Sequence, residues 1–372
     1  MKHKKTKIIF LLLSALLVRL IFIYPQYSGD IKNHIAWGQG VLEQGTVNFY
    51  DRDFPGFNQA NYPPLTIFLF TISYFLYQSV TQVLISLNQS IGIFPSFIIP
   101  YIQITNFQAV FLKLPAILAD LGIGWLLFKL TKNKLISALY LFNPAIIYIS
   151  TVWGQIESIP VFFLLLSLYY LVGKKHFLSH TSFILAVLVK QTALWLAPVF
   201  LIYWFKTQTL KQFIQGLMIQ LTIFTLIYLP FTNPVNAINS YLATLAGSSQ
   251  FVTDAAWNIW FFISSPSTLD ATPFLGATFR LWSITLLILA YLIASYKLIK
   301  KPKYSQIVIS LFILSLAAFF LQTRVHERHL FPALVFFLLI IFKNQRLLFL
   351  SYLILSSYHM LNLYYSLGLP FI

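Results

Sequence analysis

Uninterrupted apolar runs, most of them about as long as a membrane-spanning helix of 17–25 residues, recur from one end of this chain to the other. Hydrophobic residues make up 58% of the sequence and charged residues only 9%, against about 25% charged residues in a typical soluble domain. A transmembrane β-barrel would instead show alternating segments of about ten residues. The continuous runs therefore predict an all-α polytopic membrane protein, in which residues 1–372 form a single integral membrane domain.

The apolar runs predict about eleven membrane-spanning helices. The first run follows a basic stretch, as in a signal peptide, but Arg19 interrupts it and no small-residue cleavage site follows. We therefore expect an uncleaved first helix. The expected spans are 8–24, 107–130, 134–151, 157–172, 178–190, 192–206, 212–230, 275–297, 304–322, 328–342 and 347–366.

Charge is distributed unevenly between the two sides of this topology. The chain carries 25 Lys and Arg against 9 Asp and Glu. If the N-terminus is cytoplasmic, the basic clusters fall inside, as the positive-inside rule requires, and the acidic residues fall outside, except Asp120 within a span. A nucleic-acid-binding protein would gather its basic residues on one contiguous face, so no nucleic-acid partner is expected. The basic clusters are 2–7, 129–134, 173–176, Lys206, Lys211, 297–303 and 343–346.

Two long loops and one apolar hairpin are expected outside. Residues 25–64 form the first extracytoplasmic loop and residues 231–274 the second. A single crossing within 65–105 would move the next basic cluster outside, so we expect an interfacial or re-entrant hairpin there. In the alternative, 65–87 and 88–105 both cross, which keeps the orientation and gives about thirteen spans.

The first loop begins with a segment that fits a short helix. Ile31, His34, Ile35 and Leu42 fall near one helical face of residues 31–45, which predicts an amphipathic helix on the outer surface. Simple anchoring of the loop is the alternative role for this helix.

Polar residues gather at the outer boundary of the predicted bundle. An ionisable group in this position costs a few kcal/mol, so such groups indicate functional sites. Structural pairs would be scattered over both sides, whereas these residues lie on one side at similar depth. They are Asp30, Gln155, Glu157, Lys190 and the stretches 253–260 and 322–332.

The stretch "RVHERH" (324–329) combines two arginines with two histidines. His326 and His329 are three residues apart, not four as in zinc proteases, and the chain has no cysteine, so we expect neither a metal nor another cofactor. Arg324 and Arg328 would share a helical face, where they can clamp one phosphate. Basic residues are unusual outside, and an anionic ligand such as a lipid phosphate explains them; a snorkelling cluster is the alternative.

Several short motifs occur in a fixed order along nearly the whole chain. They are "GDIKNHIAWG" (29–38), "NYPPLT" (61–66), "KLPAILADLGI" (113–123), "FNPAIIYISTVWGQIES" (142–158), "LVKQTALWLAP" (188–198), "WNIW" (257–260) and "HERHLFP" (326–332). In these motifs the chain resembles the GT-C superfamily of polyprenyl-phosphate-sugar-dependent glycosyltransferases. It is most similar to the dolichyl-phosphate-glucose-dependent glucosyltransferases of N-glycan assembly and to the bacterial mannosyltransferases related to the GPI-anchor enzymes. The motifs indicate the superfamily and not the sugar.

The resemblance implies a GT-C fold, in which a helical membrane bundle holds an active-site cavity open to the lumenal or extracytoplasmic side. It also implies two interfacial helices in the first outer loop. Asp30, in the Gly-Asp pair, matches the family's catalytic aspartate, and His326, Glu327 and Arg328 match its donor-phosphate site. Eukaryotic relatives have a histidine-rich turn where this chain reads "TVWGQIES" (151–158), so the roles of the polar residues in that turn stay open.

The residue types fit an inverting sugar transfer. A lipid phosphate leaves as an anion and needs no general acid, unlike the leaving group of a glycosidase. It needs cationic stabilisation, which the basic side chains of 324–328 can supply. One carboxylate suffices to take the acceptor proton, and we expect Asp30 to do so; a helix cap or an ion pair with Lys32 or Arg19 is its alternative role.

Further polar and aromatic residues are candidates for binding the acceptor or the sugar. Asp51 and Asp53 are also rival bases. The rings of Tyr62 and Trp257 can stack on sugar faces, although aromatic residues also mark membrane boundaries. For His34 and Lys190 a structural role is about as well supported. The candidates are His34, Asp51, Asp53, Tyr62, Gln155, Glu157, Lys190, Trp257 and Asn258.

The sequence thus predicts a transferase that moves mannose or glucose from a polyprenyl phosphate to a glycan or glycolipid acceptor on the extracytoplasmic side. A lipid-linked-sugar flippase or polytopic carrier is the alternative, but carriers tend to show internal repeats, and no convincing repeat is present. The expected partners are the lipid-linked hexose, the acceptor and membrane lipids, with the protein a monomer. The short chain and the lack of a retention signal favour a bacterial plasma membrane over the endoplasmic reticulum.

Overall fold

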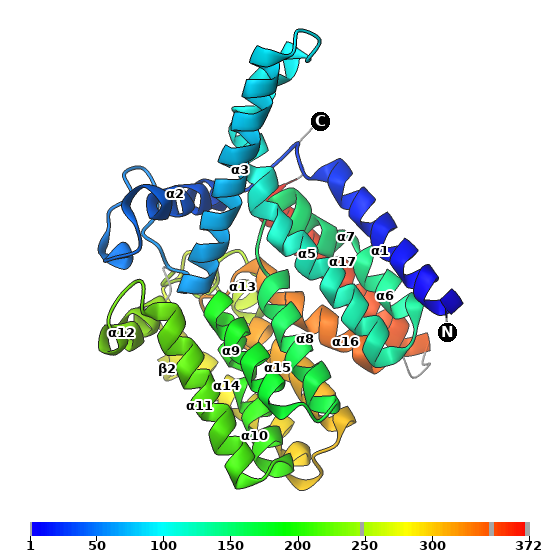
Figure 1. The fold of residues 1–372 in the computed structure, drawn as a ribbon. Helices are drawn as coiled ribbons and strands as arrows, with labels where there is room; N and C mark the ends of the chain where they lie inside the picture. Colours follow the sequence, from blue (N-terminus) through cyan, green and yellow to red (C-terminus); the bar gives the residue numbers. More distant parts are fainter. Residues whose placement is uncertain (1, 246–248, 342–345, 369–372) are drawn as a thin grey trace.

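The computed structural model describes residues 2–245, 249–341 and 346–368, and these residues are mostly helical (Figure 1). Most of the predicted basic cluster 343–346 lies outside the described residues. The longer helices are α1 (Lys2–Phe22), α2 (Gly29–Gln44), α3 (Pro64–Ser90), α5 (Thr105–Thr131), α6 (Lys134–Leu141), α8 (Ser158–Val172), α9 (His176–Val189), α10 (Ala197–Thr207), α11 (Leu210–Tyr228), α12 (Pro234–Leu245), α14 (Phe279–Lys300), α15 (Tyr304–Leu321), α16 (Phe331–Ile341) and α17 (Arg346–Leu367).

Short elements connect these helices. A single hairpin, β1 with β2, is the only sheet in the described part of the chain. The short helical turns are η1 (Phe49–Asp51), η2 (Ser96–Ile98), α4 (Ile99–Ile102), α7 (Pro144–Ile147), the π-helical turn η3 (Tyr148–Trp153), η4 (Gln191–Leu196), α13 (Ile259–Ile263) and η5 (Glu327–Leu330); the strands are β1 (Pro273–Phe274) and β2 (Ala277–Thr278).

Five of the described helices are long and apolar enough to cross a membrane, namely α3, α5, α11, α14 and α15. A sixth span results if α6 and the segment Pro144–Trp153, which are bent by 50° relative to each other, are taken together. Helices α8 and α9 are shorter and also apolar. The predicted class of helical integral membrane protein is confirmed.

The helices pack in a continuous bundle. Helix α5 packs on α8, α8 on α9, and α9 on α11, while α14, α15 and α16 form a second packed series. The main apolar core runs through both series and includes Leu141, Leu165, Leu188 and Leu334, all fully buried. In Figure 1, α8 to α11 and α15 lie roughly side by side, and α2 lies across one end of this group. The loops at that end form the candidate site.

A buried ionic network fixes the first helix to the bundle. The fully buried guanidinium of Arg19 donates to Oδ2 of Asp120 from Nε at 3.1 Å. Tyr140 donates to Oδ1 at 2.7 Å, and Ser150 and Ser158 also donate to this carboxylate. Because buried charges are tolerated only when paired and hydrogen-bonded, this network joins α1, α5, α6, η3 and α8. Arg19 is therefore paired with Asp120 and leaves Asp30 free of this partner.

The predicted helix in the first outer loop is present as α2. Ile31, His34 and Ile35 are buried as expected, but Leu42 is exposed, and Trp37 and Val41 complete the buried face instead. The α2 face packs against α3.

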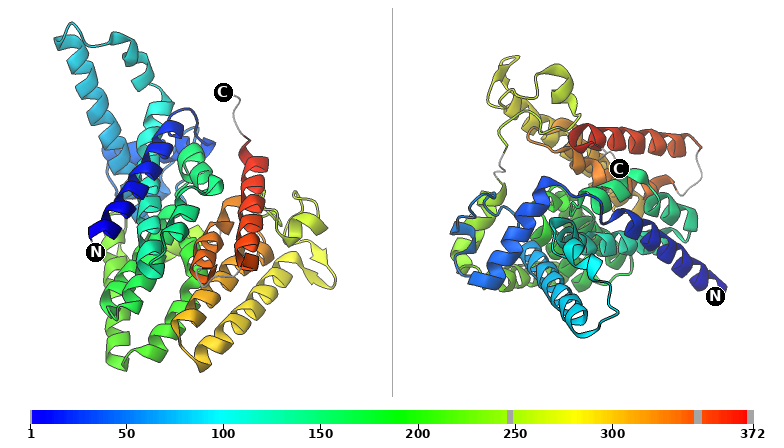
Figure 2. Two further views of the ribbon diagram at one scale, coloured as in Figure 1. Left: turned by 90° about the vertical axis from the view of Figure 1, so that its right-hand side faces the viewer. Right: turned by 90° about the horizontal axis from the view of Figure 1, so that it is seen from above.

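Helix α3 runs past α2 and projects from the rest of the molecule, as the views in Figures 1 and 2 agree. The two short turns η2 and α4 then lead to α5. Residues 91–104 contain no other helix, so the alternative in which 88–105 forms a separate crossing does not fit the structure, because a spanning helix needs about 20 residues.

Candidate active site

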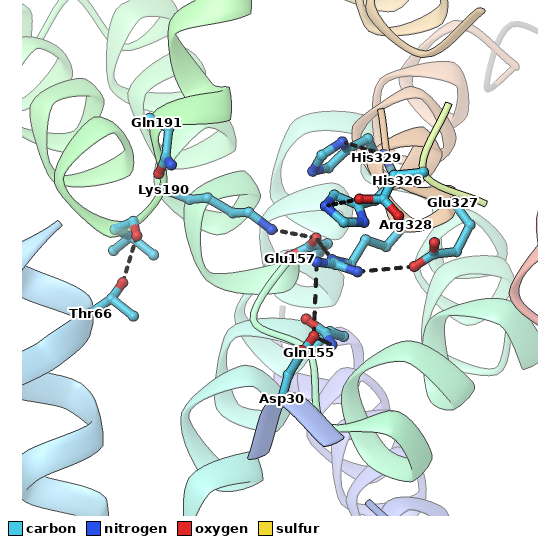
Figure 3. Close-up of polar contacts among 12 residues, drawn as sticks. Asp30, Thr66, Gln155, Glu157, Lys190, Gln191, His326, Glu327, Arg328 and His329 are labelled. Atoms are coloured by element: carbon cyan, nitrogen blue, oxygen red, sulfur yellow. Dashed lines mark hydrogen bonds and ion pairs between the residues drawn. The ribbon is translucent and has the colours of Figure 1, made fainter. Parts of the chain in front are cut away.

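Four connections that lie far apart in the sequence meet at one end of the bundle (Figure 3). They are the start of α2, the turn between η3 and α8, the turn between α9 and η4, and η5 with the residues before it. Each begins or ends a helix, where backbone groups lack intrahelical partners and polar side chains are favoured. The predicted outer polar residues are therefore brought together from separate segments.

The turn before α8 depends on a glycine. Gly154 ends η3 with φ of +83°, a left-handed conformation, and a Cβ atom at this position would lie 2.9 Å from Cδ1 of Ile31. The backbone N–H of Ser28 donates to the carbonyl of Trp153 at 3.0 Å, which fixes the start of α2 beside this turn. As a result, Nε2 of Gln155 donates to Oδ2 of Asp30 at 2.7 Å.

Arg328 lies at the centre of the polar cluster. Its Nη1 donates to Oε1 of Glu327 at 3.0 Å, and its Nε lies 3.3 Å from Oε1 of Glu157. The same Glu157 oxygen accepts from Nζ of Lys190 at 2.6 Å. The remaining nitrogen, Nη2, lies 3.9 Å from Oδ2 of Asp30, which is beyond hydrogen-bond distance. The Tyr62 side chain also has a hydrogen-bonding interaction with this guanidinium, so a ligand that binds Arg328 shares it with Tyr62.

The charges in the cluster favour an ionised Asp30. Burial raises the pKa of Asp30, but the positive charge of Arg328 and the hydrogen bond from Gln155 lower it, and the net result lies below the ordinary value. Burial opposes the charge of Arg328, yet Glu327 and Glu157 raise its pKa above the usual range. The site thus holds a carboxylate base beside a permanent cation.

A polar cavity of about 350 Å³ opens on one side of Arg328. Its charged lining consists of four cationic side chains and one carboxylate, which favours an anionic ligand. These are Lys190, Arg280, Arg324, Arg328 and Asp270. A narrow apolar slot of about 30 Å³ adjoins this cavity and is lined by Pro160, Val161, Leu164, Leu196 and Pro332, among others.

Asp30 lies outside the lining of both spaces. Its side chain is 41% exposed, and it meets the cavity through Arg328 and Gln155. Asp30, the candidate base, therefore meets the candidate phosphate-binding residues at the guanidinium group of Arg328. In the part of the chain that the structure describes, no open cavity separates the two.

The long loop 231–274 contacts this site through backbone pairing with the residues before η5. The N–H of Asp254 donates to the carbonyl of Val325 at 2.9 Å, and Oδ2 of Asp254 lies 3.3 Å from Nε2 of His326. Burial and the nearby Arg328 lower the pKa of His326 well below its usual range, whereas burial raises that of Asp254. Asp254 therefore orients a neutral imidazole at the cavity wall.

Arg324 occupies a different position from the one expected. The sequence suggested that it shares a helical face with Arg328, but it precedes η5 and has a left-handed φ of 63°. Its guanidinium binds Asp270 through Nε–Oδ2 at 2.7 Å and Nη2–Oδ1 at 3.1 Å. The prediction that Arg324 and Arg328 share one helical face is therefore wrong, because residues 324–326 pair with the second loop and do not form a helix. Both arginines nevertheless line the same cavity.

Comparison with family models supplies the decisive observation on identity. The model of the ALG6, ALG8 glycosyltransferase family matches residues 15–370, which is nearly the whole chain. The chain belongs to this family. It is therefore a membrane glycosyltransferase of the GT-C superfamily that depends on a lipid-phosphate-linked sugar. No curated protein sequence matches the chain.

Within this ALG6/ALG8 chain, several predicted candidates line the polar cavity or touch Asp30 and Arg328. Tyr62 lines the cavity with its ring 5.6 Å from Nζ of Lys190. Gln155 and Glu157 contact Asp30 and Arg328, as described. Oε2 of Glu157 is buried and has no hydrogen-bond partner among the described residues.

Other candidates lie elsewhere. His34 is buried and stacks on Phe70 at 4.2 Å between ring centroids, and burial lowers its pKa to about 3, so it is neutral. Asp51 and Asp53 are exposed and line neither cavity described here. Between them, Arg52 donates to backbone carbonyls at and just beyond the end of α2.

Trp257 and Asn258 also have structural contacts. Asn258 accepts from the N–H of Phe261, which caps α13, and donates to the carbonyl of Gln322 at 2.9 Å. Trp257 packs against aromatic side chains that include Tyr358, with ring centroids 5.9 Å apart. Neither residue lines the polar cavity or the slot.

Several residues of the site were not named individually among the predicted candidates. Asp254 and His329 fall within the predicted polar stretches 253–260 and 322–332, whereas Trp195, Asp270 and Arg280 lie outside them. Trp195 and His329 line both the polar cavity and the slot. Asp254 was visible in the sequence as one of few acidic residues of the second loop, but its position beside His326 depends on long-range pairing. Among the described residues, no group of three or more histidines and carboxylates is arranged to hold a metal ion.

Proposed function

We propose that this protein is an inverting glucosyltransferase that moves glucose from a polyprenyl phosphate, such as dolichyl phosphate, to a glycan or glycolipid acceptor on the extracytoplasmic side. The observation that carries the proposal is the contact between the Asp30 carboxylate and the Arg328 guanidinium beside a cation-lined cavity. The sequence motifs leave mannose and glucose open. Membership of the ALG6, ALG8 family favours glucose.

Asp30 is the proposed base. As the acceptor hydroxyl attacks the anomeric carbon, its proton passes to a carboxylate oxygen of Asp30, and the new glycosidic C–O bond forms. Oδ2 accepts from Gln155, so Gln155 orients the carboxylate. The exposed part of the Asp30 side chain leaves room for the acceptor. Positioned bases of this kind contribute about 10²–10⁴-fold to rate.

Arg328 is the proposed partner of the leaving group. When the bond between the anomeric carbon and the phosphate oxygen breaks, the electron pair goes to that oxygen and negative charge grows on the phosphate. Nη2 of Arg328, with Lys190 nearby, can stabilise this charge without moving a proton. His326, whose ring is held by Asp254, places a neutral imidazole beside Arg328 in the wall of the polar cavity. Glu327 acts through Arg328, whose guanidinium it holds.

The sugar and acceptor contacts are proposed at four side chains near Arg328. The free Oε2 of Glu157 can accept a hydrogen bond from a sugar hydroxyl. Tyr62 and Lys190 line the polar cavity, and Gln155 touches the base. We propose no substrate contact for five other candidates, because they line neither space and no hydrogen bond joins them to Asp30 or Arg328; these are His34, Asp51, Asp53, Trp257 and Asn258.

The membrane topology is part of the proposal. A cytoplasmic N-terminus with about eleven crossings puts the site outside, and α3 with the turns η2 and α4 at the outer interface. Residues 54–112 contain no charged residue, and Ile93, Phe97 and Tyr101 near the projecting tip are exposed, which supports contact with lipid. Because the chain has no cysteine, a single cysteine placed at Ser96 should react with a membrane-impermeant maleimide from outside. A bacterial plasma membrane stays a prediction, tested by cell fractionation.

A flippase for the same lipid-linked sugar is the competing function. Purified protein in vesicles, supplied with labelled polyprenyl-phosphate glucose and candidate acceptors, separates the two. A new glycosidic bond supports the transferase. Movement of the donor between leaflets without bond formation would replace it with the carrier.

A further inference from the structure

His329 has one ring nitrogen committed to the fold. Its Nδ1 accepts from the backbone N–H of His326 at 3.2 Å, while the ring of His326 accepts from the backbone N–H of His329 in return. A neutral imidazole carries one donor and one acceptor nitrogen. Since Nδ1 is the acceptor, the hydrogen-bond pattern assigns the proton of His329 to Nε2.

The donor nitrogen of His329 has no partner in the protein. In the part of the chain that the structure describes, no atom accepts a hydrogen bond from Nε2. This nitrogen is also not among the buried side-chain atoms that lack a partner, so it is accessible from the cavity. Figure 3 shows the ring with its free side turned toward the space between Lys190 and Arg328. The ring packs at nearly a right angle to that of Trp195, with centroids 5.1 Å apart.

The ring is uncharged although it faces an anion site. Burial lowers the pKa of His329 well below its usual range, and the positive charge of Lys190 and the presence of His326 and Arg328 lower it further. A neutral N–H donor avoids adding a third charge beside Lys190 and Arg328 and still offers a hydrogen bond.

The position of His329 matches the one part of the donor that must lie at a polar–apolar boundary. In a prenyl-phosphate sugar, the phosphate joins a polar hexose to an apolar chain. The polar cavity and the apolar slot meet at residues that line both, and these are Lys190, Thr192, Trp195, Arg328 and His329. The slot must widen to admit a prenyl unit, because its present volume of about 30 Å³ is about that of one water molecule in the liquid.

We infer that Nε2–H of His329 binds a non-bridging oxygen of the donor phosphate at the junction of the polar cavity and the apolar slot. Together with Lys190 and Arg328, it completes a three-sided cradle for that group. This inference rests on the proposed function, since it assumes a prenyl-phosphate donor. It gives His329 a role in substrate binding beyond capping η5.

Two substitutions separate phosphate binding from capping. In His329→Asn, the amide oxygen takes the place of Nδ1 and keeps the cap, but the donor toward the cavity is lost. In His329→Gln, the longer side chain brings an N–H close to the position of Nε2. With farnesyl phosphate as the probe, we expect the dissociation constant to rise about 10- to 100-fold in His329→Asn, as for a lost hydrogen bond to a charged group, and to stay within about threefold of wild type in His329→Gln.

His176→Asn is the matched control, because this partly buried histidine begins α9, and neither the polar cavity nor the slot includes it. It should bind the probe as wild type does. If folded His329→Asn binds as tightly as wild type, His329 is a cap only and the inference is overturned. If wild type itself does not bind farnesyl phosphate, the proposed donor class fails instead.

A second measurement needs no variant. Diethyl pyrocarbonate modifies accessible neutral histidines, and mass spectrometry locates the modified residue. We expect farnesyl phosphate, but not farnesol, to protect His329. Equal modification with and without the phosphate overturns the inference even if the variants do not fold.

Discussion

Asp30→Asn is the substitution that isolates the proposed base. Asparagine has nearly the same shape, and its amide oxygen can still accept the hydrogen bond that Gln155 donates to Asp30 at 2.7 Å. Arg328 keeps its contacts with Glu327 and Glu157, so the phosphate side of the site should stay in place. The substitution therefore removes the group that accepts the proton and leaves the neighbouring contacts in place.

The expected loss follows from the role of the carboxylate. A positioned general base contributes about 10²–10⁴-fold, so the barrier should rise by about 3–5 kcal/mol. Donor affinity should not weaken, because the substitution removes a negative charge that lies 3.9 Å from the Arg328 guanidinium and would repel the phosphate. A large fall in turnover with donor binding retained is the expected signature.

Single-turnover transfer with a labelled short-chain prenyl-phosphate glucose measures the chemical step, and donor binding is measured separately without acceptor. Glu43→Gln serves as the control, since Glu43 lies exposed on the same helix and should leave turnover unchanged. Wild-type-like turnover in Asp30→Asn refutes the base role. An equal loss in Asp51→Asn or Asp53→Asn, with Asp30→Asn active, assigns the role to the first loop's other carboxylates.

Four further outcomes are expected. Arg328→Lys, which cannot keep three separate donor edges, should lower kcat/KM about 10²-fold, and an unchanged value would contradict its role as the phosphate partner. Asp254→Asn, which weakens the contact with His326 at 3.3 Å, should lower kcat/KM about tenfold; wild-type kinetics would leave Asp254 without a positioning role. Burial raises the pKa of Asp30, but its neighbours lower it below the ordinary value, so the carboxylate is ionised above that pKa and becomes protonated only as pH falls through it. We therefore expect kcat to stay level from about pH 8 to about pH 5. A fall in kcat centred near neutrality would indicate another base. Asp120→Asn, which leaves a buried arginine without its counter-charge, should destabilise the fold by about 3–5 kcal/mol, and an unchanged unfolding midpoint in detergent would show that the network is dispensable.

The parts of the site that depend on residues close together in the chain could be predicted from the sequence. Asp30 and Arg328 stand out because ionisable groups at a membrane boundary are costly and because the family motifs contain them. The buried face of α2 followed from helical spacing at Ile31, His34 and Ile35. These features need only the order of residues along one segment.

The remaining features depend on contacts between distant segments. Arg324 was expected on a helix, but pairing of residues 251–255 with 324–326 holds it in a left-handed turn. The same pairing brings Asp254 to His326, and no periodic pattern in either segment predicts this contact. His34 has the residue type of a ligand, yet its stacking on Phe70 becomes visible only once α2 and α3 are packed.

The spacing of His326 and His329 also fits a structural motif that was not among the predictions from the sequence. Two histidines three residues apart argue against a zinc protease motif, but the same spacing fits a reciprocal cap between the N-cap residue and the third residue of a helical turn. That pattern, normally seen with Ser or Thr and Glu or Gln, was the signal available in the sequence.

The configuration of the newly formed glycosidic bond tests single displacement most directly. A synthetic β-linked prenyl-phosphate glucose, incubated with purified protein and acceptor, yields a product whose anomeric proton coupling is read by NMR. A single displacement, with Asp30 as the only base and Arg328 as the partner of the leaving phosphate, predicts the α-linked product alone. A β-linked product would contradict it, because retention requires a covalent glycosyl intermediate or a second displacement.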